Sequence, residues 1–194
     1  MFTGIIEAVA EVTSLVRKKN LYVLTVAKPV LFDDVKVGDS IANDGVCLTV
    51  TSLRGGAFQF DLMKETLEAT TLKHAAAGGK LNLERAMKAD ARLGGHFVTG
   101  HVDAVARITK VRTLANYVEY RVAPGKALMR YLVPKGSVAI DGISLTVGKV
   151  AKDWFAVYFI PHTLDVTTIG AKKAGDHVNI ETDLLAKYIL KTKG

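Results

Sequence analysis

Three kinds of side chain in this sequence are suited to chemistry: a thiol, a pair of hydroxyls and two imidazoles. Cys47 is the single cysteine, and a thiolate is a good nucleophile. Ser144 and Thr146 are two residues apart, so on a strand their hydroxyls share one face. His96 and His101, five residues apart, would take opposite faces of a strand, so we rank His101 above His96 for proton transfer.

Each of these residues also has a structural interpretation. A lone cysteine at the start of a β-branched run is typical of a small buried side chain. The hydroxyls of Ser144 and Thr146 are equally suited to a structural role. Asp183 precedes an apolar-faced segment that contains Leu184, Leu185, Tyr188 and Ile189, where it would cap a helix.

The elements that must position these residues follow from an internal repeat. Four blocks recur in the same order, the first at a shift of 96 residues and the others at 97. They are FTGIIEAVAEV (2–12) with VTGHVDAVARI (98–108), SIANDGVCLTV (40–50) with SVAIDGISLTV (137–147), ETLEATT (65–71) with HTLDVTT (162–168), and LNLE (81–84) with VNIE (178–181). The chain therefore consists of two homologous halves.

Each half has the pattern of a small β-barrel. Apolar residues alternate over 57–62 and 117–122, which is typical of half-buried strands. Asp-Gly pairs at 44–45 and 141–142 precede short β-branched runs, as in tight hairpins. Helix is predicted only over 126–132 and after Asp183. Regularly spaced short strands with turn signals predict one closed barrel per half.

Composition excludes several classes of protein. Lys and Arg number 26 against 19 Asp and Glu, but they are scattered and not interleaved with aromatics, which argues against a nucleic-acid partner. The sequence has no run of eighteen apolar residues, so no membrane-spanning helix is predicted. The first residues lack the basic start of a secretory signal, so none is expected. No metal-spaced Cys/His cluster occurs. With one cysteine, we expect a cytoplasmic protein without disulfides.

The halves differ at a few equivalent positions. Cys47 corresponds to Ser144, Ile5 to His101, Phe2 to Val98, and Lys64 to Pro161. Such differences are required if two copies of one substrate play different roles.

Seven motifs make the sequence resemble the riboflavin synthase family over nearly its whole length: MFTGI (1–5), NDGVCLTV (43–50), DLMKETL (61–67), GGHFVTGHVD (94–103), KGS (135–137), IDGISLTV (140–147) and IPHTL (160–164). The resemblance implies an all-β fold of two six-stranded antiparallel Greek-key barrels, at 1–96 and 97–183, with a short C-terminal helix at 184–194. It also implies a homotrimer whose sites are shared between subunits, with possible association with lumazine synthase.

The reaction implied by the resemblance is a dismutation. Two molecules of 6,7-dimethyl-8-ribityllumazine exchange a four-carbon unit and give riboflavin and 5-amino-6-(D-ribitylamino)uracil. Oxidation and reduction balance within the pair, so no cofactor and no metal is expected. The resemblance assigns catalytic roles to Cys47, His101, Ser144, Thr146, Asp183 and Phe2. The ring of Phe2 could be a lid over a flat ligand or a core anchor.

The resemblance also implies the residues that bind substrate. In the N-terminal barrel they are Gly4, Ile5, Ile6, Ser40, Leu48, Thr49, Asp61, Leu62, Met63, Lys64, Glu65 and Thr66. In the C-terminal barrel they are Gly100, Val102, Lys135, Leu145, Ile160, Pro161, His162, Thr163, Leu164 and Asp165.

One alternative is a non-catalytic lumazine- or flavin-binding relative of the antenna type, which would lack polar catalytic groups. Cys47, His101, Ser144 and Thr146 are all present, which favours the enzyme. The segment after Asp183 allows only about three helical turns, which leaves little helix to hold a trimer together.

Overall fold

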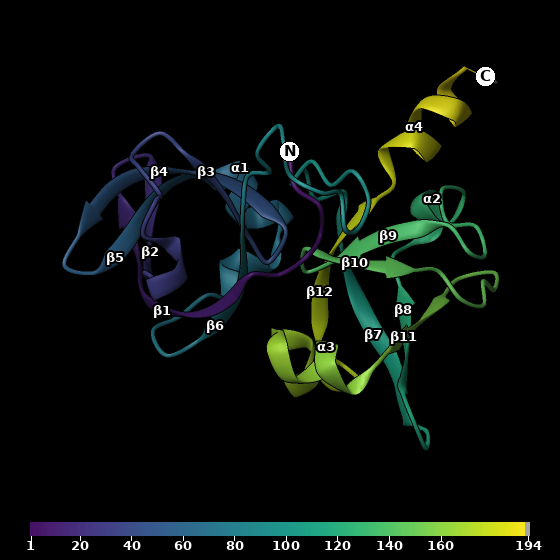
Figure 1. Ribbon diagram of the computed structural model, residues 1–194. Coiled ribbons are helices and arrows are strands. Elements are labelled where there is room, and N and C mark those ends of the chain that lie inside the picture. Colours follow the sequence, from purple (N-terminus) through teal and green to yellow (C-terminus); the bar gives the residue numbers. More distant parts are fainter. Residues whose placement is uncertain (193–194) are drawn as a thin grey trace.

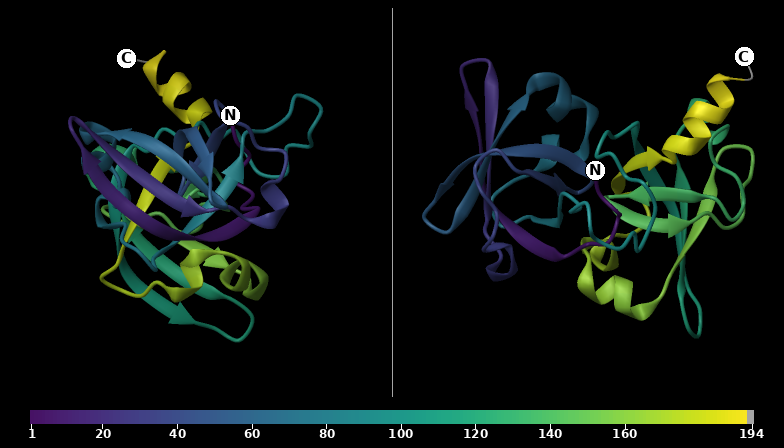
Figure 2. Two further views of the ribbon diagram at one scale, coloured as in Figure 1. Left: turned by 90° about the vertical axis from the view of Figure 1, so that its left-hand side faces the viewer. Right: turned by 45° about the horizontal axis from the view of Figure 1, so that its top comes forward.

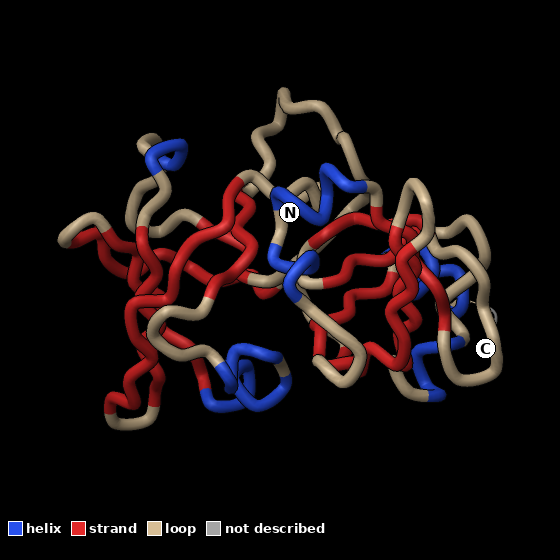
Figure 3. The backbone as a smooth tube through the Cα atoms, turned by 90° about the horizontal axis from the view of Figure 1, so that it is seen from below, coloured by secondary structure: helices blue, strands red, loops and turns tan. Residues whose placement is uncertain are grey.

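The computed structural model describes residues 1–192, and these form two six-stranded antiparallel units side by side (Figures 1 and 2). Figure 3 shows that strands make up most of both units and that the helices are short. The N-terminal strands are β1 (Ala8–Lys18), β2 (Leu21–Ala27), β3 (Ser40–Asn43), β4 (Val46–Arg54), β5 (Ala57–Met63) and β6 (Lys80–Arg85). The C-terminal strands are β7 (Ala104–Thr113), β8 (Val118–Ala123), β9 (Ser137–Ile140), β10 (Ile143–Thr146), β11 (Phe155–Phe159) and β12 (His177–Thr182).

Short helices connect the strands. They are α1 (Lys64–Ala69), α2 (Lys126–Met129), α3 (Pro161–Val166) and α4 (Leu184–Lys191), with 3-10 turns η1 (Val30–Phe32), η2 (Thr71–His74) and η3 (Thr168–Ala171). The helix predicted over 126–132 is thus real but ends at Met129. Among residues 1–192, no helix combines the length and the apolar character that a membrane span requires.

The first unit is a closed barrel with the strand order β1-β2-β5-β4-β3-β6. Its interior is filled by the alternating apolar residues that the sequence predicted, among them Phe58, Phe60 and Leu62 of β5. Asp44 and Gly45, both at positive φ, make the tight hairpin between β3 and β4. The predicted barrel is confirmed for this half.

The second unit has the equivalent order, β10-β9-β12-β7-β8-β11, but its seam between β10 and β11 is only partly joined. β10 has four residues, whereas β4 has nine. Two hydrogen bonds between Gly148, Lys149 and Ala156 and one bridge from Val150 to Phe155 connect the edges. This barrel is therefore nearly closed. The predicted pair of six-stranded antiparallel barrels is confirmed, except that the second is open along part of one edge.

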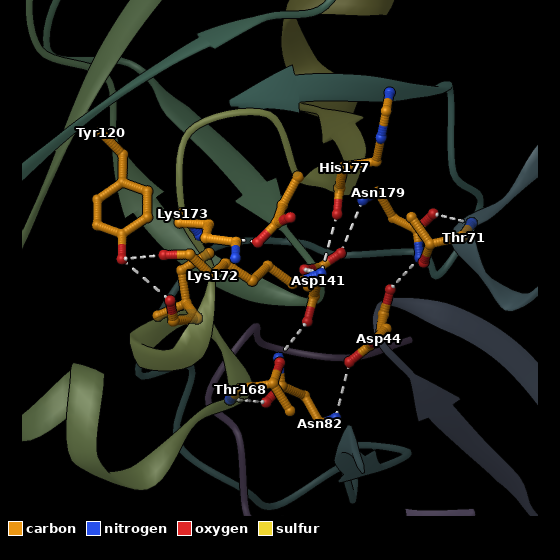
Figure 4. Close-up of polar contacts among 12 residues, drawn as sticks. Asp44, Thr71, Asn82, Tyr120, Asp141, Thr168, Lys172, Lys173, His177 and Asn179 are labelled. Atoms are coloured by element: carbon orange, nitrogen blue, oxygen red, sulfur yellow. Dashed lines mark hydrogen bonds and ion pairs between the residues drawn. The ribbon is translucent and has the colours of Figure 1, made fainter. Parts of the chain in front are cut away.

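The two units meet along a pseudo-twofold arrangement of buried amides (Figure 4). Asn82 Nδ2 donates to the Asp141 carbonyl oxygen at 2.9 Å, and Asn179 Nδ2 donates to the Asp44 carbonyl oxygen at 2.8 Å. Each asparagine Oδ1 also accepts from a threonine N–H of the opposite half, Thr168 or Thr71, at 2.8 Å. Paired hydrogen bonds of this kind fix the two barrels in one orientation.

A symmetry-breaking charge lies beside this interface. The carboxylates of Asp44 and Asp141 are both buried, and Lys172 Nζ lies 3.3 Å from Asp141 Oδ2. Burial and the nearby charge of Asp141 raise the pKa of Asp44 well above its ordinary value. The position in the first half that corresponds to Lys172 is Ala75.

Helix α4 extends away from the second barrel (Figure 1). As predicted, Asp183 caps it, with Oδ1 accepting from the Leu185 N–H at 2.9 Å. Lys187 fixes the helix to the start of β7 through Asp103, at 2.7 Å. The last two residues of the predicted helix, 193–194, lie outside the described residues, and the predicted domain boundaries stay a prediction.

Candidate functional site

The first candidate surface is the outer face of the N-terminal barrel where β4 and β5 separate. Their pairing begins at Val50 and Phe60, so the preceding residues of β4 and the last residues of β5 flank an unpaired edge. Thr49, Asp61 and Met63 are exposed on this outer face, and Cys47 is partly exposed. We call this edge the N seam.

The equivalent surface of the C-terminal barrel, the C seam, lies between β10 and β11. Ser144, Thr146 and Ile160 have their side chains on its outer face, while Ile143 and Val147 point into the core. Helices α1 and α3 directly follow β5 and β11 and bring further predicted residues to these edges. All of the following are exposed or partly exposed: Lys64, Glu65, Thr66, Lys135, Pro161, His162, Thr163, Leu164 and Asp165.

Three predicted substrate-binding side chains point away from a ligand on these surfaces. Leu48 and Leu62 are buried in the N-terminal core, and Leu145 packs against the C-terminal core. Only their backbone groups remain for a ligand at the seams. Alternation along a strand turns every second side chain inward, so the predicted role of these three residues stays a prediction for their backbone groups alone.

The segments that precede each barrel cross to the opposite barrel. The Gly4 carbonyl accepts from the Ser144 N–H at 2.7 Å, and the Gly100 carbonyl accepts from the Cys47 N–H at 2.9 Å. Correspondingly, Ile6 packs against the C-terminal core and Val102 against the N-terminal core. We predicted that 4–6 serve the first barrel and 100–102 the second. The structure instead places each segment in contact with both barrels, where Phe2 pairs with Val98, and their contact with substrate stays a prediction.

Two buried carboxylates hold these crossed segments. Glu84 accepts from Thr3 N and Oγ1 at 2.6 and 2.7 Å and from Gly4 N at 3.0 Å. Glu181 makes the same contacts with Thr99 and Gly100, at 2.6, 2.7 and 2.9 Å. Burial raises the pKa of Glu84, and its hydrogen bonds to Thr3 oppose that rise. The LNLE and VNIE repeat was the sequence signal for this pair.

The imidazole beside Ser144 belongs to His96. His96 Nδ1 lies 2.7 Å from Ser144 Oγ, whereas the side chain of His101 is exposed and makes no side-chain hydrogen bond in the described part of the chain. The sequence named no partner for Ser144, and the ranking of His101 above His96 for proton transfer stays a prediction. The parity argument assumed a strand over 96–101, but this segment contains a single bridge at Val98 and a positive φ at Gly100.

The environment of His96 favours a neutral ring. Burial lowers its pKa, and the negative charges of Asp183 and Glu181 oppose that shift. Its Nε2 is buried without a hydrogen-bond partner among the described residues. A neutral imidazole in contact with a hydroxyl is suited to receive a proton through that hydroxyl.

Phe2 is a core anchor. It is fully buried with Ala42, Val98 and Ala139 between the two barrels, and Cys47 packs against this cluster. The interpretation of its ring as a lid is wrong, because no part of it is open to a ligand.

A cavity of about 620 Å³ lies between the N-terminal barrel and the connection that follows β6. Of the predicted residues it contains Ile5 and Ser40 but neither Cys47 nor Ser144. Cys47 and Ser144, the central residues of the two seams, therefore lie outside this cavity. Within residues 1–192, no three His, Cys, Asp or Glu side chains are grouped so that they could hold a metal ion.

Comparisons with known proteins match both halves. The family model described as the lumazine binding domain covers residues 3–86 and 99–183. A riboflavin synthase of Actinobacillus pleuropneumoniae is 44% identical, over 97% of this chain and 88% of that protein. Those of Bacillus subtilis (strain 168) and Mycobacterium bovis are 43% and 44% identical, over 98% and 97% of this chain and 89% and 96% of theirs.

A solved structure supports the fold. The crystal structure of LumP complexed with riboflavin superposes with a TM-score of 0.85 at 23% identity, over 94% of this chain and 99% of that chain. A second structure, of LumP complexed with 6,7-dimethyl-8-(1'-D-ribityl) lumazine, gives a TM-score of 0.84 over the same shares.

Proposed function

Because the chain belongs to the riboflavin synthase family, with a lumazine binding domain in each half, we propose that it converts two 6,7-dimethyl-8-ribityllumazine molecules into riboflavin and 5-amino-6-(D-ribitylamino)uracil. Each seam holds one lumazine. The observation that carries the proposal is that two similar seams present different chemical groups, Cys47 in one and Ser144 with His96 in the other.

The two groups suit the two roles that the reaction requires. One lumazine must lose a proton from its C7 methyl group to become a carbon nucleophile. The Ser144 hydroxyl, in contact with the neutral imidazole of His96, provides a path for that proton. Cys47 is placed to add to or polarise the ring of the other lumazine.

Turnover can be tested by measuring riboflavin formation from lumazine. Purified protein incubated with the lumazine alone should form one riboflavin for every two lumazines consumed, followed by the change in fluorescence and by chromatography. The alternative is a protein that binds lumazine without converting it. The similarity in fold to LumP, whose structures hold lumazine or riboflavin, is the observation that favours this alternative. Lumazine that stays bound and unchanged would establish that alternative.

We further propose a cytoplasmic homotrimer in which the N seam of one subunit faces the C seam of the next. Exposed apolar side chains at both seams, Met63 and Ile160, and on α4 support burial in an assembly. Association with lumazine synthase, which would supply the substrate directly, stays a prediction of the family resemblance.

Shared sites can be tested by complementation. One variant carries Cys47→Ala and Asp61→Ala at the N seam, and the other carries Ser144→Ala and His96→Ala at the C seam. After subunit exchange, mixed trimers should recover part of the activity, because some junctions pair two intact seams from different chains. If exchange is confirmed by mass and activity does not rise above that of the parents, the site lies within one chain.

A further inference from the structure

The C seam carries an exposed aromatic side chain that the N seam lacks. Phe58 pairs with Val26 in the first barrel, and Phe155 pairs with Val122 in the second. Counting along the strands from these pairs, Tyr158 takes the position of Asp61, on the outer face of β11. It is 44% exposed, although its neighbours Val157 and Phe159 are buried in the core.

A glycine makes room for this ring. A Cβ on Gly148 would lie 2.3 Å from Tyr158 Cε2, so the ring rests directly on the backbone of Gly148. The φ of Gly148 is not among the positive values, so space rather than backbone conformation explains the glycine. The equivalent residue of the N-terminal barrel is Thr51, whose Oγ1 donates to the Gln59 carbonyl oxygen at 3.1 Å.

A second tyrosine fixes the orientation of the first. The rings of Tyr117 and Tyr158 meet edge to face, with centroids 5.5 Å apart and planes at 86°. The position of Tyr117, directly before β8, is taken in the first barrel by Leu21. Ile160, two residues after Tyr158 and on the same outer face, is 58% exposed, so the C seam carries apolar side chains where the N seam has the carboxylate of Asp61.

We propose that Tyr158, oriented by Tyr117 and Gly148, contacts the flat ring of the lumazine or riboflavin held at the C seam and makes this the tighter of the two ligand positions. The proposal rests on the proposed function, since it takes the seams as ligand positions. An aromatic contact of this kind favours binding by about twofold to tenfold, and Asp61 offers no equivalent contact at the N seam.

The test uses the full-length protein and riboflavin as the probe, with affinities from titration and fluorescence decays of the bound flavin. A phenol in contact with an excited flavin quenches its fluorescence by electron transfer, so the wild type should show a short-lived component. Tyr158→Phe should keep the affinity within twofold and lose that component. Tyr158→Leu should lose the component and weaken the tighter binding step about twofold to tenfold.

Two further variants separate contact from structure. Gly148→Ala displaces the exposed ring of Tyr158 while leaving the tyrosine in place, and should weaken the tighter step without lowering the melting temperature as a core substitution would. Asp61→Asn, at the N seam, should leave the short-lived component intact. If the wild type binds riboflavin and Tyr158→Leu shows the same fluorescence decay and the same affinity, the role of Tyr158 is overturned but the proposed function is not. A wild type that does not bind riboflavin would overturn the proposed function as well.

Discussion

Ser144 and Cys47 stand at equivalent positions, each three residues after the aspartate of an Asp-Gly turn, yet only Ser144 has an imidazole within hydrogen-bond distance. This difference follows from Gly94-Gly95, which bring the connection between the halves against the C-terminal barrel. A Cβ on Gly95 would lie 2.1 Å from the Thr3 carbonyl oxygen and 2.9 Å from Ser144 Oγ. The close approach of this backbone places His96 on the hydroxyl.

Substitution at this contact should affect rate more than binding. We expect Ser144→Ala and His96→Ala each to lower kcat by about 10²- to 10⁴-fold while the affinity for riboflavin changes little, and Cys47→Ser to slow turnover in the same sense. The double variant of Ser144 and His96 should be no slower than the slower single variant, because both act on one proton path. Fully additive losses in steady-state kinetics would separate the two residues.

The neutral ring of His96 gives a pH prediction. Because burial lowers its pKa below the ordinary 6.5, the basic form persists to lower pH than an exposed histidine would allow. The kcat should therefore stay level on acidification through pH 6.5 and fall only below it. Measuring kcat against pH for the wild type and for His96→Gln checks this, since the variant should lose that acidic limb.

The buried carboxyl of Asp44 predicts a pH-dependent cost to stability. The pKa of Asp44 is higher in the folded than in the unfolded protein. The ionised carboxylate therefore lowers the free energy of unfolding at pH values above the folded pKa, and this loss of stability disappears as the pH falls toward the ordinary 3.8. Asp44→Asn keeps an oxygen for the Asn82 N–H and should raise the free energy of unfolding at pH 7, with a gain that shrinks on acidification. Urea denaturation at several pH values measures this difference, and a gain independent of pH would contradict it.

Individual residues show where prediction from the sequence reached its limit. The alternation around Phe58, Phe60 and Leu62 gave the faces of β5 correctly, because the residues lie in a regular strand. The same parity rule does not apply to His96 and His101, because 96–101 is an irregular segment shaped by contacts with the other half. The sequence alone does not reveal such contacts, since they depend on how the two barrels meet.

At the scale of elements, the crossed segments explain why Gly4 and Gly100 are glycines. Their φ values are +78° and +80°, and an added Cβ would lie 2.6 Å from Ser144 Cβ or 2.5 Å from Cys47 Cβ. The repeated Thr-Gly pairs were visible in the sequence. Their exchange between barrels was not, because each half by itself could place its own segment on its own barrel.

These glycines have a matched control in Gly38, which has a φ of +99° but open space around it. Gly38→Ala should cost about 1–2 kcal/mol of stability from backbone strain alone. Gly100→Ala and Gly4→Ala add a steric clash and should cost about 2–5 kcal/mol. Equal losses for all three in chemical denaturation would show that the close approach to Cys47 and Ser144 adds nothing.

At the scale of the whole molecule, α4 presents an unpartnered apolar face. Leu185, Tyr188 and Ile189 are 57%, 63% and 57% exposed, and the helix points away from both barrels. In the proposed trimer this face is covered by neighbouring copies. The repeat predicted the two barrels well, since duplicated turns and strands define each one, but nothing in a single chain specifies how copies assemble.

Charge on this face should separate the subunits. Tyr188→Lys with Ile189→Lys is expected to give monomers in sedimentation velocity and to lower activity, because the seams of different subunits no longer meet. The control is Lys191→Ala, which changes the charge of the same exposed helix outside the apolar face and should leave the assembly unchanged. A doubly substituted protein that sediments like the wild type would place the subunit contact elsewhere.

The exchange of leading segments has a consequence for the origin of the chain. A polypeptide of about half this length would carry a leading segment that contacts a barrel other than its own. Its Thr3 and Gly4 would be held by Glu84 of the same barrel, but the Gly4 carbonyl would need a donor from a second barrel. Two identical copies of such a half could satisfy each other by reciprocal insertion. The present molecule is then a permanently tethered form of that pair, and the tether freed the two members to diverge at Cys47 and Ser144.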